Sequence, residues 1–259
     1  MRNLNAIFTI ALRDYLKFLR DRGRIIATFI FPIMFIGVLG SSLQGSFSAD
    51  AGYNFLGFVF TGVLGQTLFQ STASGIISLI QDRTSDFSQE LFVSPVSRLA
   101  IIFGKIFGET LVAMSQVVGI VAFALLIGVP LNLGQFVSLV PAFFVACLLG
   151  GAFGLLILSN LDSERGANQI FPFVIFPQFF LSGIFAPIKN LPPVLDIISH
   201  LVPMRYAVDL VRGIYYQGAP EYSKIVLLPV WQNLLIITIM FLVMFIIGSV
   251  LFTKNEKNR

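Results

Sequence analysis

The stretch "TLVAMSQVVGIVAFALLIGVPLNLGQFVSLVPAFFVACLLGGAFGLLILSNL", residues 110–161, contains no Asp, Glu, Lys or Arg. A helix that crosses the hydrocarbon core of a bilayer needs about 20 apolar residues, so this stretch is too long for a single crossing. It is interrupted at "GVPLNLG", residues 128–134, where glycine, proline and asparagine favour a turn. We therefore predict two membrane helices, 101–128 and 136–158, joined by a tight connection.

The rest of the chain repeats this pattern. Hydrophobic residues make up 56% of the sequence and charged residues only 12%, which is typical of an integral membrane protein. Other uncharged runs occur at 25–49, 51–81, 166–188 and 225–253. The sequence predicts an all-α membrane protein with one domain, residues 1–259. Six transmembrane helices are expected at about 25–43, 53–80, 101–128, 136–158, 168–186 and 229–252.

The basic residues indicate how the spans are oriented. Six spans place both termini and two internal connections on the same side, which then holds Arg2, Arg13, Lys17, Arg20, Arg22, Arg24, Arg83, Arg98, Lys105, Arg165, Lys254, Lys257 and Arg259. The opposite side holds only Lys189, Arg205, Arg212 and Lys224. Because positive charge is enriched on the cytoplasmic side, we predict a cytoplasmic-membrane protein with both termini in the cytoplasm. Basic residues at the ends of apolar runs argue against a nucleic-acid partner.

The N-terminal segment, residues 1–22, has a helical period. Its apolar positions are Leu4, Ile7, Phe8, Ala11, Leu12, Tyr15 and Leu19, and the charged residues Arg13, Asp14, Lys17 and Arg20 occupy other faces. This pattern predicts an amphipathic helix in the inner interface, with its lysine and arginine toward anionic lipid headgroups. The alternative is an ordinary polar leader.

Two cytoplasmic connections are candidates for contact with another protein. In "QDRTSDFSQELFVSPVSR", residues 81–98, a short helix with apolar residues on one side and acidic flanks would suit a groove on a partner. Its candidate residues are Ser85, Asp86, Phe87, Glu90, Leu91, Phe92, Pro95 and Arg98. The second connection, 159–168, offers Asp162, Glu164 and Arg165. The alternatives are a solvated connector and a tight solvated turn.

The outer region, about 187–228, is long but apolar. Leu195, Ile198 and Leu201 are spaced as one short helix, and a second follows Pro203. Neither is long enough to span a bilayer, so we predict re-entrant helices between spans five and six, buried against protein. They would form either an outer gate or a cap that only packs. The gate candidates are Pro203, Tyr206, Asp209 and Arg212.

Catalytic chemistry is not indicated. The sequence lacks the G-x-x-x-x-G-K-[ST] motif, since "FGKIFGE", residues 103–109, has neither the first glycine nor the final hydroxyl residue. Lys105 and Glu109 are charges one turn apart near the inner end of span three, and we expect them to satisfy each other or to reach the interface. The chain is thus predicted not to be an enzyme and to bind no cofactor or metal itself.

Two longer patterns carry a family likeness. "QELFVSPVSRLAIIFGKIFGET", residues 89–110, resembles the cytoplasmic signature of ABC-2 type permeases, the membrane subunits of ABC exporters. "NQIFPFVIFPQFFLSGIFAPIKNLPPVLDIISHLVPMRYAVDLVRGIYY", residues 168–216, resembles their second hallmark. The residues that match the hallmark are Leu181, Ser182, Gly183, Leu191, Pro192, Pro203, Tyr206, Ala207, Asp209, Arg212 and Gly213. The likeness is greatest to the drug and lipid branch, which includes daunorubicin-type permeases.

This resemblance implies a homodimer, or a pseudo-dimer with a related second permease, in which each copy recruits a separate ATPase subunit that binds ATP and Mg²⁺. Residues 85–93 would be the coupling helix, and the cargo would be a hydrophobic or amphipathic compound, drug-like or lipid-like. One alternative is a permease for a lipid-linked polysaccharide. A less favoured one is an ATP-independent channel lined by the polar residues of span two, which are Gln66, Thr67, Gln70, Ser71, Thr72 and Ser74.

Overall fold

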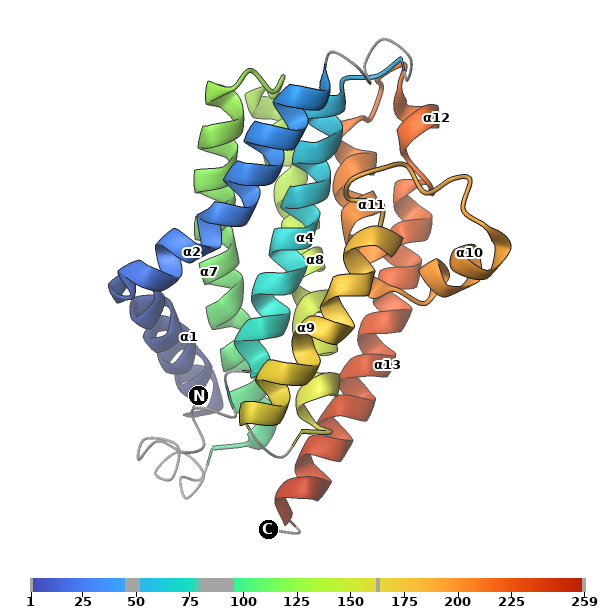
Figure 1. The fold of residues 1–259 in the computed structure, drawn as a ribbon. Coiled ribbons are helices and arrows are strands. Elements are labelled where there is room, and N and C mark those ends of the chain that lie inside the picture. Colours follow the sequence, from blue (N-terminus) through green and yellow to red (C-terminus); the bar gives the residue numbers. More distant parts are fainter. Residues whose placement is uncertain (1, 45–51, 78, 80–95, 162–163, 258–259) are drawn as a thin grey trace.

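A computed structural model describes the chain except for residues 1, 45–51, 78, 80–95, 162–163 and 258–259. The described residues form helices and no β-strand, which confirms the all-α prediction (Figure 1). In chain order the elements are α1 (Arg2–Arg20), α2 (Arg22–Pro32), the π-helix η1 (Ile33–Gly40), α4 (Phe55–Ile77), α7 (Arg98–Leu126), α8 (Leu133–Leu158), α9 (Glu164–Leu181), α10 (Pro193–His200), α11 (Pro203–Tyr215), α12 (Tyr222–Ile225) and α13 (Val230–Lys257).

Within the described residues, 4 helical segments are long and apolar enough to cross a membrane: Arg22–Gln44, Arg98–Leu126, Leu133–Leu158 and Tyr222–Lys254. They correspond to the first, third, fourth and sixth predicted spans. The helices predicted for the second and fifth spans are present as α4 and α9, but they do not belong to this set.

The predicted break within residues 110–161 is confirmed, because α7 ends at Leu126 and α8 begins at Leu133. Gly128 adopts a φ of 89°, a left-handed conformation that glycine reaches without steric cost. The Asn132 side chain accepts a hydrogen bond from the Gln135 amide at 2.8 Å, and Gln135 returns one to the Asn132 amide at 3.1 Å. This capping box starts α8 and therefore fixes where the turn ends.

Helix α4 lies at the centre of the bundle, packed against α7, α8 and α11. Its side chains Phe58, Phe60, Leu64 and Phe69 are fully buried. A helix covered by protein can carry polar residues that lipid would exclude, and α4 holds Gln66, Thr67 and Thr72 in buried positions.

Six segments run along the bundle and alternate in direction: α2–η1, α4, α7, α8, α9 and α13 (Figure 1). Helix α1 and the end of α13 lie at one end of the bundle, while α10, α11 and α12 lie toward the other. The chain therefore keeps the helix order that the sequence predicts.

The helix predicted over residues 1–22 is present as α1, but its faces differ from the prediction. Leu4, Phe8 and Leu12 are exposed, whereas Ala11 is buried. Asp14, expected on a polar face, is buried as well, because α1 packs one side against α7 and brings Asp14 to Lys105. Helix α1 thus has a protein-facing side and a separate exposed apolar stripe.

The two short outer helices are also present, and they differ in burial. Helix α11 is buried at every position except Ile214, and it contacts α4, α8 and α13. Helix α10 is peripheral, with Val194 and Ile197 largely exposed. Only α11 is therefore part of the core of the bundle.

Candidate functional site

A cavity of about 240 Å³ lies among α2, α4, α7 and α9. Its lining consists of Arg24, Ala27, Thr28, Phe31, Pro32, Gln66, Thr67, Gln70, Ser71, Ser74, Gln116 and Phe179. Five of these residues come from α4, where the spacing 66, 70, 74 and 67, 71 places them along one side of the helix. The polar residues that the sequence singled out in span two therefore form one wall of this cavity, except Thr72, whose hydroxyl donates to backbone carbonyls of its own helix.

Two buried glutamines of the cavity lining, Gln66 of α4 and Gln116 of α7, have unused hydrogen-bonding capacity. Gln66 and Gln116 are each only 3% exposed, and their Oε1 atoms have no hydrogen-bond partner among the described residues. The amide nitrogen of Gln66 donates to Gln70 Oε1, so this pair uses only one of the two side-chain oxygens. A buried acceptor without a partner costs about 1–3 kcal/mol, and in a native protein such a group calls for a bound molecule or water.

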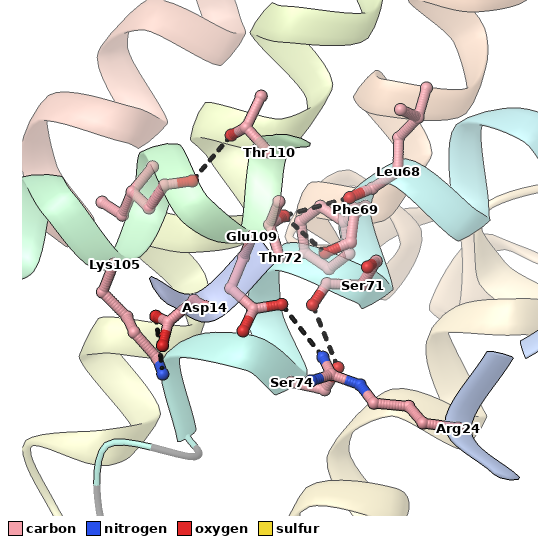
Figure 2. Close-up of polar contacts among 11 residues, drawn as sticks. Asp14, Arg24, Leu68, Phe69, Ser71, Thr72, Ser74, Lys105, Glu109 and Thr110 are labelled. Atoms are coloured by element: carbon pink, nitrogen blue, oxygen red, sulfur yellow. Dashed lines mark hydrogen bonds and ion pairs between the residues drawn. The ribbon is translucent and has the colours of Figure 1, made fainter. Parts of the chain in front are cut away.

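Two ionic contacts lie near the cavity, and one of them involves Arg24, a residue of the cavity lining (Figure 2). The guanidinium of Arg24 donates to Glu109 Oε2 at 3.1 Å, and Glu109 is 1% exposed. Asp14 Oδ2 lies 2.9 Å from Lys105 Nζ without hydrogen-bond angles, so this contact is electrostatic. Gly75 of α4 faces the Glu109 carboxylate so closely that a Cβ atom would collide with it.

Lys105 and Glu109 were expected to satisfy each other or to reach the interface. Each instead forms its ion pair with a residue of another helix, while an electrostatic interaction between the two remains. The two side chains lie one turn apart on α7 but face different neighbours. Lys105 faces α1 and pairs with Asp14, while Glu109 faces α2 and pairs with Arg24. The ion pairs therefore tie both N-terminal helices to α7.

Aromatic rings border the cavity on the side away from the ion pairs. The rings of Phe31 and Phe179 lie 5.6 Å apart between centroids, and Phe31 also contacts Phe35 at 4.1 Å. Phe35 in turn stacks on Phe185 at 4.7 Å. Close to these rings, Pro32 has no N–H to donate and is followed directly by the π-helix η1, a type of segment frequent at functional sites.

The predicted outer-gate residues make well-defined contacts. Pro203 begins α11, and the Tyr206 hydroxyl donates to the His200 carbonyl at 2.8 Å. The Asp209 carboxylate accepts hydrogen bonds from the Leu227 amide at 2.8 Å, the Leu228 amide at 2.9 Å and the Asn233 side chain at 2.8 Å. Burial raises the pKa of Asp209, and these three hydrogen bonds partly offset the rise. Asp209 therefore joins α11 to the start of α13.

Arg212 is the other anchor of α11. Its guanidinium donates to the carbonyls of Phe58 at 3.3 Å and Ile184 at 3.2 Å, and it lies 3.8 Å from the centroid of the Phe58 ring. Burial lowers the pKa of Arg212 to about 10, a shift that nearby Asp209 partly offsets, so the group is charged at neutral pH. Arg212 thus links α11 to α4 and to the turn after α9, and the gate role remains a prediction.

Most of the predicted cytoplasmic contact residues lie outside the described part of the chain: Ser85, Asp86, Phe87, Glu90, Leu91, Phe92, Pro95 and Asp162. Arg98 begins α7, and its guanidinium donates to the Thr253 carbonyl of α13 at 3.1 Å. Glu164 begins α9, and Arg165 in its first turn is exposed. The contact role of all these residues stays a prediction.

An all-helical bundle with 4 segments able to cross a bilayer defines a multi-pass membrane protein. The family model of the ABC-2 type transporter matches residues 5–216, so the chain belongs to that family. It is accordingly a membrane permease of an ABC transporter, as the resemblance implies.

Relatives of known name agree with this assignment. The "Putative transport permease ycf38" of Cyanophora paradoxa is 26% identical over 267 residues, covering 98% of this chain and 90% of the relative. The "Inner membrane transport permease YadH" of Escherichia coli K12 is 24% identical over 207 residues, covering 79% of this chain and 80% of that protein. The "Probable multidrug ABC transporter permease YbhR" of the same organism is 29% identical over 148 residues, covering 55% and 39%.

Proposed function

We propose that this chain is the permease subunit of an ABC exporter that moves a hydrophobic or amphipathic compound, drug-like or lipid-like, across the cytoplasmic membrane. The energy comes from a separate ATPase subunit that binds ATP and Mg²⁺. The observation that carries the proposal is the cavity among α2, α4, α7 and α9, where amides and hydroxyls meet aromatic rings. Such a mixture of apolar lining and a few polar groups suits an amphipathic ligand.

The proposed topology has six membrane crossings, with α4 as the second and α9 as the fifth. The alternating directions of the helices support it, as does the burial of α4, which shields its polar residues from lipid. The positive-inside rule then places both termini in the cytoplasm. In this orientation α10 and α11 lie at the outer side, where α11 would serve as the outer gate and α10 would dip into the lipid.

Helix α1 is proposed to lie at the inner membrane surface. Its exposed stripe of Leu4, Phe8 and Leu12 would contact acyl chains. Lys17 and Arg20, which are exposed on a neighbouring face, would contact anionic headgroups. The ion pair between Asp14 and Lys105 holds the helix against α7 in this position.

Coupling to ATP hydrolysis is proposed to run through residues 85–93, with a second contact at Asp162, Glu164 and Arg165. These residues would sit in a groove of the ATPase, which closes when nucleotide binds. Residues 85–93 come shortly before Arg98, which contacts α13, and α7 also carries the ion pairs to α1 and α2. A push on the start of α7 would therefore move α1, α2 and α13 together.

A second copy of the chain is proposed to complete the pathway. Helix α9 exposes Phe173, Phe176 and Phe180, and α2 exposes Ile26 and Ile30. These exposed apolar faces would be covered by the same elements of a second permease, or by lipid. A symmetric dimer would use one surface patch on both copies.

The test is export in liposomes that contain the permease and its ATPase. Cargo should stimulate ATP turnover, and Glu90→Arg should abolish this stimulation, while Glu221→Arg near the opposite end of the bundle should preserve it. Unchanged export in Glu90→Arg would exclude a coupling role for Glu90. Ion conductance without the ATPase would favour a channel instead, and transport restricted to lipid-linked glycans would favour a polysaccharide permease.

A further inference from the structure

We propose that the cavity among α2, α4, α7 and α9 selects uncharged compounds that carry hydroxyl groups on an aromatic or alkyl body. The inference rests on the proposed function and adds to it the chemical class of cargo. It draws on three observations: the buried glutamine oxygens of the cavity lining that have no hydrogen-bond partner, the pairing of Arg24 with Glu109, and the volume of the cavity.

The cavity lining offers hydrogen-bond acceptors from α4 and α7 for a ligand to satisfy. Gln66 Oε1 and Gln116 Oε1 lack protein partners among the described residues, and both side chains are nine-tenths or more buried. The hydroxyl oxygen of Ser71 also lacks a partner there. Amide oxygens only accept hydrogen bonds, so the matching ligand donates them.

The charged lining of the cavity disfavours an ionic headgroup. Arg24 is the one charged residue among the described lining residues, and its guanidinium is already engaged by the Glu109 carboxylate at 3.1 Å. An ammonium group would enter without a carboxylate of its own, and a phosphate or sulfate would enter without a cation of its own. Because burying an uncompensated charge is expensive, the site favours a neutral donor, and a hydroxyl group meets that need.

The size of the cavity indicates how much of the ligand it holds. Its volume of about 240 Å³ is below the range of about 300–1,000 Å³ that is typical for a whole drug-sized ligand. The hydroxyl-bearing end would therefore fill the cavity, with Phe31 and Phe179 against its apolar part. The remainder would lie along exposed residues of α9 such as Phe176, whose ring centroid lies 6.3 Å from that of the lining residue Phe179.

Binding of probes with one tail and three headgroups tests this selection. The permease without its ATPase, in nanodiscs, would be titrated with hexyl glucoside, hexyltrimethylammonium and hexyl sulfate, and saturable binding followed by saturation-transfer NMR. We expect saturable binding of the glucoside and only non-saturable partitioning of the two ions. Saturable binding of either ion at comparable affinity, or of no probe at all, would overturn the proposal.

Substitutions with a matched control locate the site. Gln116→Leu and Gln66→Leu should each weaken glucoside binding about 3- to 10-fold, the effect of a lost hydrogen bond. Gln178→Leu is the control, because Gln178 is equally buried with an unpaired Oε1 but lies outside the cavity lining. Thermal unfolding of Gln116→Leu should match the parent, which shows that the site and not the fold has changed. Equal affinity of Gln116→Leu and Gln178→Leu would contradict the proposal.

The binding experiment needs no ATP, so its outcome is separate from that of the export assay. Cargo-stimulated ATP turnover that is unaffected by Gln66→Leu and Gln116→Leu would overturn the selection site and leave the exporter function intact. Glucoside binding that depends on these glutamines, without any ATPase coupling, would support the site and contradict the exporter function.

Discussion

The ion pair between Asp14 and Lys105 makes a quantitative prediction about how α1 is held. Both side chains are only 3% exposed, with 2.9 Å between Lys105 Nζ and Asp14 Oδ2. Removing Lys105 leaves the buried Asp14 carboxylate with the more distant guanidinium of Arg13, 3.9 Å from Asp14 Oδ1, and breaking a buried pair in this way costs about 3–5 kcal/mol. For a chain of this length each kcal/mol lowers the midpoint of thermal unfolding by about 2–4 °C, so Lys105→Met should lower it by about 6–20 °C.

The double variant Asp14→Asn/Lys105→Met separates charge from packing. With both charges removed, no uncompensated ion remains, and we expect the double variant to be more stable than Lys105→Met alone. The two substitutions should therefore couple by about 0.5–3 kcal/mol in a double-mutant cycle.

Thermal unfolding of the purified permease in detergent, followed by intrinsic fluorescence, measures these effects. The control is Lys254→Met, since Lys254 is exposed near the end of α13 and its loss should shift the midpoint little. A Lys105→Met midpoint equal to that of the control would refute the buried pair. Strict additivity of Asp14→Asn and Lys105→Met would show that the two side chains do not interact.

Three further predictions concern the packing of the bundle. Asp209→Ala should lower the unfolding midpoint by about 4 °C or more, because it leaves the partly buried amides of Leu227 and Leu228 without their acceptor, and an unchanged midpoint would show that water replaces the carboxylate. Arg212→Lys should destabilise as well, since Arg212 Nη2 donates to both carbonyls while the planar guanidinium stacks on Phe58, and lysine has no planar group to stack there; stability equal to the parent would mean that charge alone suffices. Gly154→Leu should cost about 1–3 kcal/mol in thermal unfolding, because a side chain at 154 meets the Ala73 backbone. The control is Gly218→Leu, since the surroundings of Gly218 are open and its φ of 80° means that the substitution reports backbone strain alone. A smaller effect at 154 than at 218 would contradict close packing of α4 on α8.

The positions of the helices were predictable because they depend on local chemistry. Uncharged runs and turn residues lie next to one another in the sequence, and the break at 128–134 follows from Gly128 and from the capping pair of Asn132 and Gln135. The family likeness could also be recognised from sequence, because the motifs at 89–110 and 168–216 are continuous segments.

The candidate site was predictable only in part. The polar residues of α4 could be singled out from their unusual place in a span, although they suggested a pore and not a pocket among four helices. Arg24, Gln116 and Phe179 were not identified as its partners, because a lone polar or aromatic residue in an apolar run carries no sign of which helix it faces.

Hydropathy and turn propensity act over a few residues, so a membrane-embedded, all-helical permease and the order of its helices can be inferred from the amino-acid sequence. The ion pairs of Lys105 with Asp14 and of Glu109 with Arg24, a partner 85 residues away along the chain, depend on how the helices pack. On α7 the two charges are natural partners by spacing. The packing of α1 and α2 against α7 brings in competing counterions, and a buried charge pairs with whichever counterion the packing places closest.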